Sequence, residues 1–225
     1  MFYSPRYKLL FVAIPKTGTR SIHDFLHKID PGGYRRKLVL DNGREITIDQ
    51  IGGRVVGHAT ARDLKNAIGA EEWDKLNVFA FVREPKQKLA SAYAYNRGLS
   101  MGKLLAIGKR FRLVSYKTIA SALLAKLLPF AAYILVYTMK TNREYCCDQA
   151  GELLIPNIGR TEYLEEDFKM LLEKMGVNVE CELKLGHLNK SKSSGYAEKI
   201  DGVFSSKVFN LKYRKELEFY RSLFD

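Results

Sequence analysis

The chain has 225 residues, of which 46% are apolar, and 37 Lys and Arg stand against 25 Asp and Glu, giving a net charge of +12. This length and apolar content exclude a disordered chain and allow one globular domain with a sizeable core. Three irregularly spaced cysteines exclude a disulfide scaffold and a zinc site, whereas the charge favours an anionic partner: nucleic acid, an acidic membrane, or a phosphorylated or sulfated ligand.

Short apolar runs, typical of buried strands, alternate along the chain with segments of helical periodicity. Strands are predicted at 9–14, 54–56, 78–82 and 153–158, and a hairpin is predicted around 38–40 and 46–48. Helices are predicted at 21–29, at 162–175 before Gly176, and at 203–223. Two more helices are predicted from their first residues: one after an N-cap at Thr60 with Asp63 at N3, and one from Pro85 to about Arg97. This alternation predicts an α/β fold with a central parallel sheet and helices on both faces.

The turn after the first predicted strand has the composition of an anion site. Its sequence, PKTGTRS, combines cations with small and hydroxyl side chains: Lys16, Thr17, Gly18, Thr19, Arg20 and Ser21. A strand-to-helix turn also presents backbone N–H groups and the positive end of a helix dipole. A Walker A loop places its Lys after the second Gly, whereas Lys16 precedes Gly18. The turn predicts a site for phosphate or a similar oxyanion, with an ordinary capped turn as the alternative.

A second basic residue ends the next buried strand. Arg83 follows the run 78–82, and Ser91 lies eight residues on, inside the helix that Pro85 begins. The bidentate guanidinium and the hydroxyl can bind one phosphate together. Without the first turn as support, the preferred interpretation would be that Arg83 is an ordinary surface residue and Ser91 an ordinary packed residue, with no ligand. Because ligands of open parallel sheets bind at the carboxyl ends of strands, two such ends with cations favour one anion site.

The segments IPKTGTRS and FVREPKQKLASAYAY resemble the 5′-phosphosulfate and 3′-phosphate motifs of sulfotransferases that use 3′-phosphoadenosine 5′-phosphosulfate (PAPS). The similarity is closest to the carbohydrate-type branch, which includes heparan sulfate 2-O-sulfotransferase-like proteins and bacterial relatives. Three further segments resemble the family: VGHATARDLKNAIG, IGRTEYLEEDFKMLLEKMGV and HLNKSK. The resemblance covers about residues 9–220 except 98–140. Glu84 and Lys88 depart from the motif, which often has Asn and usually Arg there, so weaker cofactor affinity is expected.

The resemblance implies a P-loop-NTPase-like three-layer fold, a single sulfotransferase domain over 1–225 and a variable substrate-side insertion at about 98–140. It also implies transfer of a sulfuryl group from PAPS to a hydroxyl or amine of an acceptor, a carbohydrate or glycoconjugate. Lys and Arg can take the part that Mg²⁺ plays in kinases, because a sulfuryl group carries less negative charge than a phosphoryl group. No metal and no nucleic-acid partner are therefore expected.

Residue roles follow from the same resemblance. Lys16 is expected to stabilise the leaving 5′-phosphate oxygen, while the N–H groups of 17–20 and the Thr19 and Arg20 side chains hold the phosphosulfate. Arg83 and Ser91 are expected to bind the 3′-phosphate. The remaining candidates for contact with the nucleotide are Arg160, Asn189 and Lys190.

Of the four histidines, His58 is the candidate general base for the acceptor hydroxyl, because it ends a predicted strand on the rim of Lys16 and Arg83. A capping or packed His is the alternative. His23 and His27 are interpreted as a structural or solvated pair. His187 lies in a predicted loop, where contact with the cofactor and simple exposure to solvent are both open.

The stretch 103–137 has no counterpart in the resemblance. Five basic residues lie in 103–117, and 119–137 is nearly all apolar, but Lys126 and Pro129 interrupt it. This pattern favours a buried helix, a break and a second element over a membrane span. Peripheral membrane contact through 103–137 and an acceptor pocket for an apolar substrate stay open.

Two other functions compete with the sulfotransferase. A P-loop-type kinase would need the Walker order of Lys and Gly, and a basic nucleic-acid-binding domain would explain the charge but not the hydroxyls and cations at strand ends. We expect reduced thiols and no targeting segment, and therefore a cytoplasmic protein, at or away from the inner face of a membrane.

Overall fold

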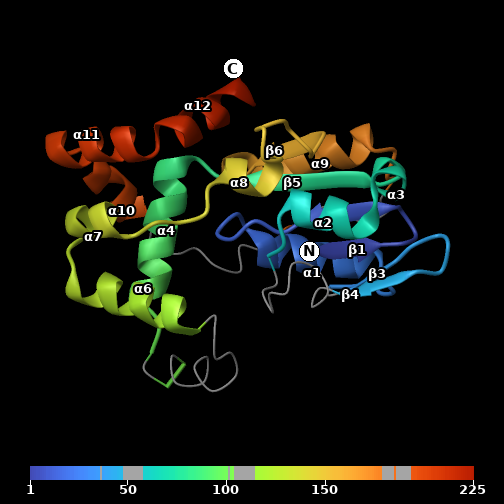
Figure 1. Cartoon of the computed structure of the whole chain (residues 1–225), viewed down its shortest axis with the longest axis horizontal. Helices are drawn as coiled ribbons and strands as arrows, with labels where there is room; N and C mark the ends of the chain where they lie inside the picture. The colour runs from blue at the N-terminus through green and yellow to red at the C-terminus, as the bar shows by residue number, and fades with distance from the viewer. Residues whose placement is uncertain (36, 48–57, 101, 104–114, 179–184, 186–193) are drawn as a thin grey trace. The chain divides into compact units, whose positions relative to one another are not determined.

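The computed structural model describes residues 1–35, 37–47, 58–100, 102–103, 115–178, 185 and 194–225 (Figure 1). The chain forms two compact units. The first, here called the sheet unit, comprises Met1–Arg83 and Asn142–Asn189, and the second, the helical unit, comprises Glu84–Thr141 and Lys190–Asp225. The chain thus leaves the sheet unit directly after Arg83 and returns to it at Asn142.

The sheet unit is built on a four-stranded, mostly parallel sheet in the order β1-β2-β5-β6. Its strands are β1 (Phe2–Ser4), β2 (Leu9–Val12), β5 (Asn77–Val82) and β6 (Asn157–Arg160). Strand β1 is antiparallel to β2, whereas β5 is parallel to both β2 and β6. A separate antiparallel hairpin of β3 (Lys37–Val39) and β4 (Glu45–Thr47) confirms the predicted hairpin.

The helices of the sheet unit are α1 (Thr19–Ile29), α2 (Ala61–Ile68), α3 (Ala70–Asp74), α8 (Asn142–Cys146), the short 3₁₀ helix η2 (Thr161–Tyr163) and α9 (Leu164–Lys174). The predicted N-cap of α2 is confirmed, because the Thr60 hydroxyl accepts from the Asp63 N–H and the Asp63 carboxylate accepts from the Thr60 N–H. Gly176, at a φ of +68°, follows α9 as predicted.

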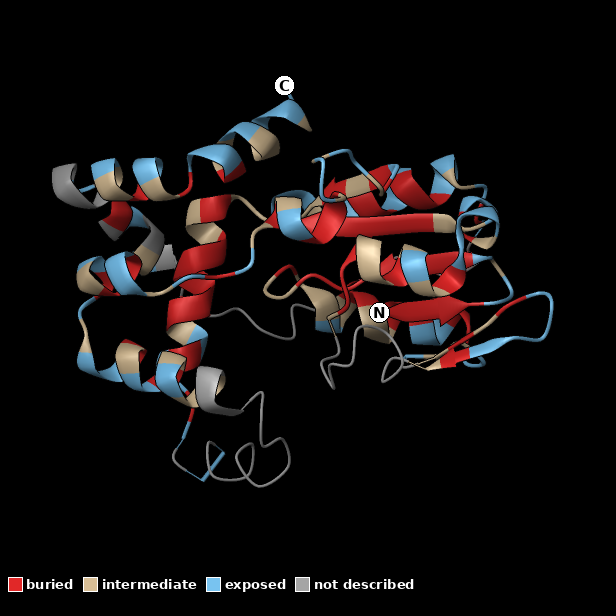
Figure 2. Cartoon of the chain, in the orientation of Figure 1, coloured by how far each residue is buried: buried red, intermediate tan, exposed pale blue. Residues whose placement is uncertain are grey.

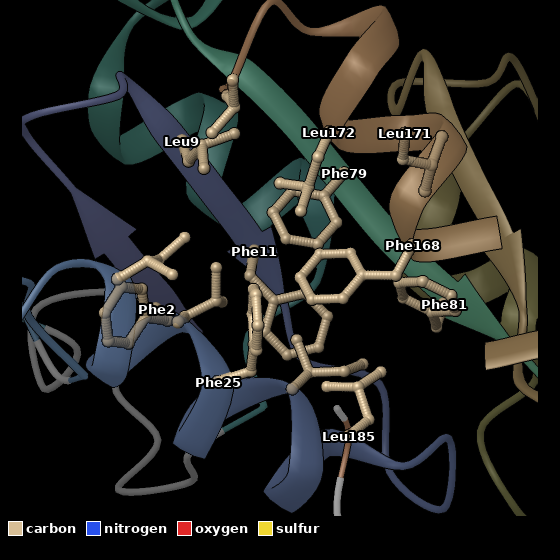
Figure 3. Packing of buried hydrophobic residues seen from close by; sticks show 14 of the residues in the cluster. Phe2, Leu9, Phe11, Phe25, Phe79, Phe81, Phe168, Leu171, Leu172 and Leu185 are labelled. Atoms are coloured by element: carbon tan, nitrogen blue, oxygen red, sulfur yellow. The ribbon is translucent and has the colours of Figure 1, made fainter. Parts of the chain in front are cut away.

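Aromatic rings on one face of the sheet pack against α1 and α9 (Figure 3). Phe168 of α9 stacks on Phe79 of β5 with ring centroids 5.7 Å apart and meets Phe25 of α1 edge-on at 5.3 Å. Helices α2 and α3 lie in front of the sheet in Figure 1, while α9 lies behind it. The α/β class and the mostly parallel sheet are therefore as predicted.

The helical unit contains α4 (Pro85–Arg97), α6 (Ser115–Leu127), α7 (Phe130–Val136), α10 (Ser194–Ala197), the 3₁₀ helix η3 (Glu198–Asp201), α11 (Val203–Lys212) and α12 (Arg214–Ser222). Helix α4 is buried along most of its length (Figure 2). Its Leu89 and Tyr93 pack in one cluster with Phe130, Tyr133 and Phe209. The predicted limits of α4 and the predicted break at Pro129 between two helices are confirmed. The helix before the break was predicted to be buried, which was wrong, since Leu123 and Leu127 of α6 are exposed.

Two predicted elements were wrong in their limits. The strand predicted at 153–158 begins only at Asn157, because the N–H of Leu154 donates to the Cys146 carbonyl and Pro156 has no N–H to offer. The helix predicted at 203–223 is two helices that meet at Tyr213, whose buried hydroxyl donates to the Tyr137 carbonyl. The strand predicted at 54–56 lies outside the described residues.

Within the described part of the chain, no helix is long and apolar enough to cross a membrane.

Candidate anion site at the carboxyl edge of the sheet

The turn between β2 and α1, residues 13–18, is held by hydroxyl groups of the turn and of the first residue of α1, which fold back on the end of the strand. The hydroxyls of Thr17 and Thr19 donate to the same acceptor, the carbonyl of Ile14, at 2.9 and 2.8 Å. Thr17 is fully buried. In this conformation the two hydroxyl hydrogens serve the turn itself, so donors to an anion have to come from the backbone and from the cations of the turn.

The start of α1 has no capping side chain at its N-cap position. That residue is Gly18, at a φ of +71°. The N–H groups of the first turn have no partner within the helix and form its positive end, which suits an anion. A β-carbon on Gly18 would lie 3.1 Å from Cδ2 of Leu164, so both the backbone angle and the space require glycine.

The two predicted anion-binding turns meet within the sheet unit. The Arg83 guanidinium, directly after β5, donates from NH1 to the Lys16 carbonyl at 3.3 Å. The Arg83 carbonyl in turn accepts from the side-chain amide of buried Asn142 at 2.8 Å. Lys16 and Arg83, here called the cation pair, therefore lie at the carboxyl ends of two adjacent parallel strands, as the sequence predicted.

The surroundings of Lys16 disfavour its charged form. Burial first, and then the nearby Arg83 guanidinium, lower the pKa of the Lys16 ammonium to about 8. Lys16 also has a φ of +71°, a value that residues with a β-carbon rarely adopt. A bound oxyanion would offset the charge repulsion and restore the pKa of Lys16 toward its ordinary value.

His58 lies beside the same strand end. Its Nδ1 is 2.7 Å from the carbonyl of Ala13, which follows β2. Because a carbonyl can only accept, Nδ1 carries the hydrogen and Nε2 carries the lone pair. Burial lowers the pKa of His58 below its ordinary value, although the bond to Ala13 opposes this shift. The imidazole is thus neutral at pH 7, and the nitrogen that accepts a proton is Nε2.

Arg160 is held by a carboxylate. Its Nε and NH2 donate to the two oxygens of Asp167, both at 2.9 Å, and its backbone N–H donates to the same carboxylate at 2.7 Å. The guanidinium also lies 4.4 Å from the ring centroid of Tyr163. These contacts join β6 to α9, and a role in cofactor binding stays a prediction.

Of the other predicted site residues, Arg20 and Ser21 lie in the first turn of α1, Ser91 lies in the helical unit, and the rest lie outside the described residues. Ser91 is buried in α4, so its convergence with Arg83 on one phosphate stays a prediction. Glu84 caps α4 by accepting from the Gln87 N–H at 2.8 Å, and buried Lys88 donates to the Lys140 carbonyl at 3.1 Å. Asn189 and Lys190 are among the residues that the structure does not describe.

Three residues of this edge were not predicted from the sequence. Asn142 binds the Arg83 carbonyl, Leu164 lies against Gly18, and the Thr161 hydroxyl donates to the Val82 carbonyl at the end of β5 at 2.8 Å. Thr161 directly follows β6, so a search for hydroxyls after every buried strand would have found it.

Comparison of the chain with protein-family models, curated proteins and solved structures finds no match.

Proposed function

We propose that the chain is a PAPS-dependent sulfotransferase that transfers a sulfuryl group to a hydroxyl or amine of an acceptor, a carbohydrate or glycoconjugate. The observation that carries the proposal is the cation pair beside the uncapped start of α1. The motifs around Lys16 and Arg83 resemble those of the family, and the sheet unit would be a variant of the family's P-loop-like fold.

The residues of the turn fit an anionic phosphosulfate. Backbone N–H groups follow Gly18 at the start of α1, and both the backbone angle and the contact with Leu164 favour glycine there. Burial and Arg83 disfavour the charged form of Lys16, and a bound anion would offset this effect. When bound, PAPS would supply an activated sulfuryl group. The α1 N–H groups, with Arg20 and Ser21 near them, would hold its negative oxygens, and Arg83 would bind the 3′-phosphate.

In the proposed mechanism, each of the chain's own groups has one task. The Lys16 ammonium would stabilise the negative charge that develops on the 5′-phosphate oxygen as the bond to sulfur breaks. His58 Nε2 would accept the proton of the acceptor hydroxyl, while Nδ1–H stays bonded to Ala13 and fixes the ring. All these groups act by position and charge, so no metal is needed.

The proposal is tested by thermal unfolding of the full chain with 3′-phosphoadenosine 5′-phosphate in a metal-free buffer. At about 100 times its Kd, this ligand should raise the Tm by roughly 5–10 °C. ATP with Mg²⁺ and duplex DNA serve as parallel ligands. A shift with ATP and Mg²⁺ alone would favour the kinase, and a shift with DNA alone the nucleic-acid-binding domain; either result would contradict the sulfotransferase. A positive result justifies a screen of acceptors with labelled PAPS.

A further inference from the structure

The net charge of the chain is confined to one unit. The helical unit contains 18 Lys and Arg against six Asp and Glu, a net of +12, whereas the sheet unit has 19 of each and no net charge. Residues 85–141 contain ten Lys and Arg and no Asp or Glu at all. The candidate anion site in the neutral sheet unit does not account for this excess, so the helical unit must have another reason for it.

Large apolar side chains are exposed on the same unit. On α6, Leu123 and Leu127 are one turn apart and are 41% and 78% exposed. Between them in the sequence, exposed Lys126 donates from its ammonium to the Arg97 carbonyl at 3.0 Å. Two exposed leucines one turn apart, with a lysine between them, make this face of α6 a candidate contact surface.

A second group of this kind lies where α7 and α11 meet. The Lys212 ammonium donates to three carbonyls at the end of α7, those of Ile134, Leu135 and Tyr137, at 3.0, 2.9 and 2.8 Å. Leu211, which precedes Lys212 in α11, is 83% exposed.

The end of α7 contributes its own exposed side chains to this group. Leu135 and Val136 are 47% and 54% exposed there. Exposed Lys207 lies one turn before Leu211, on the same face of α11. Apolar and cationic groups thus share this surface as they do on α6.

We propose that the helical unit binds peripherally to an anionic membrane through two leucine–lysine patches, one on α6 (Leu123, Lys126 and Leu127) and one where α7 and α11 meet (Leu135, Val136, Lys207 and Leu211). The apolar side chains would enter the boundary between headgroups and acyl chains, and the lysines would face the acidic headgroups. Nucleic acid or an acidic glycan would use the charge but leave the leucines in water. Of these three anionic partners, a lipid surface alone uses both features, so the observations favour it. The proposal does not depend on the proposed enzymatic activity.

The test is co-sedimentation of the full chain with lipid vesicles. Vesicles of phosphatidylcholine with added phosphatidylserine should bind the chain, and vesicles of phosphatidylcholine alone should bind it far less. Lys207→Gln should weaken binding roughly fivefold. The double variant Leu127→Ser, Leu211→Ser should weaken it more, and the binding that remains at high salt should disappear with it.

Matched substitutions in the sheet unit serve as controls. Met170→Ser and Lys169→Gln change an exposed apolar and an exposed basic residue of α9 and should leave vesicle binding unchanged. Thermal unfolding checks that every variant is folded. No binding to the acidic vesicles would overturn the proposal. So would equal binding by the leucine variant and the wild type, especially if heparin or DNA competes, because the surface would then recognise polyanions by charge alone.

Discussion

Lys16 combines several unfavourable features within one residue. Its backbone is in the left-handed region, its side chain is partly buried, and the charge of the Arg83 guanidinium adds to burial in lowering its pKa. Strained backbone and perturbed pKa values tend to gather where a protein binds or reacts, because only function compensates for their cost. At the level of single residues, Lys16 is therefore the strongest indication that the carboxyl edge of the sheet binds an anion.

The lowered pKa of Lys16 predicts that anion binding is linked to proton uptake. Below pH 8 the ammonium is charged and attracts the ligand, whereas above pH 8 the free protein loses this proton and binding weakens. A bound anion raises the pKa again, so the protein should take up a fraction of a proton on binding near pH 8.5. Calorimetry of 3′-phosphoadenosine 5′-phosphate in two buffers of different ionisation enthalpy measures this uptake.

The matched variant for that measurement is Lys16→Arg. It keeps the charge but does not titrate in this range, so its binding should show no proton uptake and a flatter pH dependence between about pH 7 and 9. Equal proton uptake by the variant and the wild type would show that another group titrates and that Lys16 does not contact the anion.

His58 is expected to act in turnover and not in cofactor binding. Its neutral imidazole has the lone pair on Nε2, so it can accept a proton at pH 7. His58→Ala should lower kcat by roughly two to four orders of magnitude, the usual contribution of a general base. A phenolic acceptor of low pKa should partly restore the rate, because it ionises without help.

The control for His58 is His27→Ala, which removes an exposed histidine of α1 and should change neither quantity. Turnover and the affinity for 3′-phosphoadenosine 5′-phosphate are measured for both variants. Near wild-type turnover in His58→Ala would show that His58 is not the base. Its role would then be structural, through the hydrogen bond that joins the segment before α2 to the end of β2.

Among the elements, the turn between β2 and α1 depends on Gly18. Gly18→Ala places a β-carbon in a left-handed conformation, which costs roughly 1–2 kcal/mol, and moves it against Leu164 of α9, which adds about 1–2 kcal/mol more. Gly43→Ala is the matched control, since Gly43 has a φ of +78° and no atom within 4 Å of the added β-carbon. Urea unfolding should therefore show the larger loss of stability for Gly18→Ala, and equal losses would exclude the contact with Leu164.

The elements that local chemistry specifies were predictable from the sequence. Pro85 at the first position of α4 and the capping box at Thr60 fix helix starts through the backbone groups of neighbouring residues. The start of β6 was not predictable from apolarity, because Leu154 uses its N–H in a local bond to Cys146. The break at Tyr213 likewise depends on a distant partner, the Tyr137 carbonyl.

Some contacts of the candidate site were likewise predictable from the sequence, and others were not. The approach of Lys16 to Arg83 follows from two parallel strands that end at one edge, so sequence order was enough to predict it. The pairing of Arg160 with Asp167 was not predicted, although the two lie seven residues apart, because an exposed basic residue after a strand and an acid in a helix carry no sign of each other. Contacts made only in three dimensions need the structure.

At the scale of the whole molecule, the two units differ strongly in net charge. The sheet unit balances its charges, whereas the helical unit carries the entire excess of +12. Like charges in one compact unit repel each other and lower its stability, and salt screens this repulsion. The two units should therefore respond differently to ionic strength.

Hydrogen exchange measured by mass spectrometry separates these responses. When the ionic strength rises from about 0.1 M to 1 M, the Debye length falls from ~10 Å to ~3 Å, so protection of α4 peptides should increase while protection of β5 peptides stays nearly constant. The single tryptophan, Trp73, is buried in α3 of the sheet unit, so its fluorescence during unfolding gives a second and independent measure of that unit. Its transition should shift little with salt.

Charge variants decide whether repulsion is the cause. The variant Lys207→Gln, Lys215→Gln removes two exposed positive charges from α11 and α12, and it should raise α4 protection at low salt and reduce the response to salt. The matched variant Lys169→Gln, Lys174→Gln changes the same number of exposed lysines on α9 and should leave α4 protection as it is. If α4 and β5 gained protection in parallel in every variant, the chain would unfold as one cooperative unit, and the concentration of charge in the helical unit would have no effect on its stability.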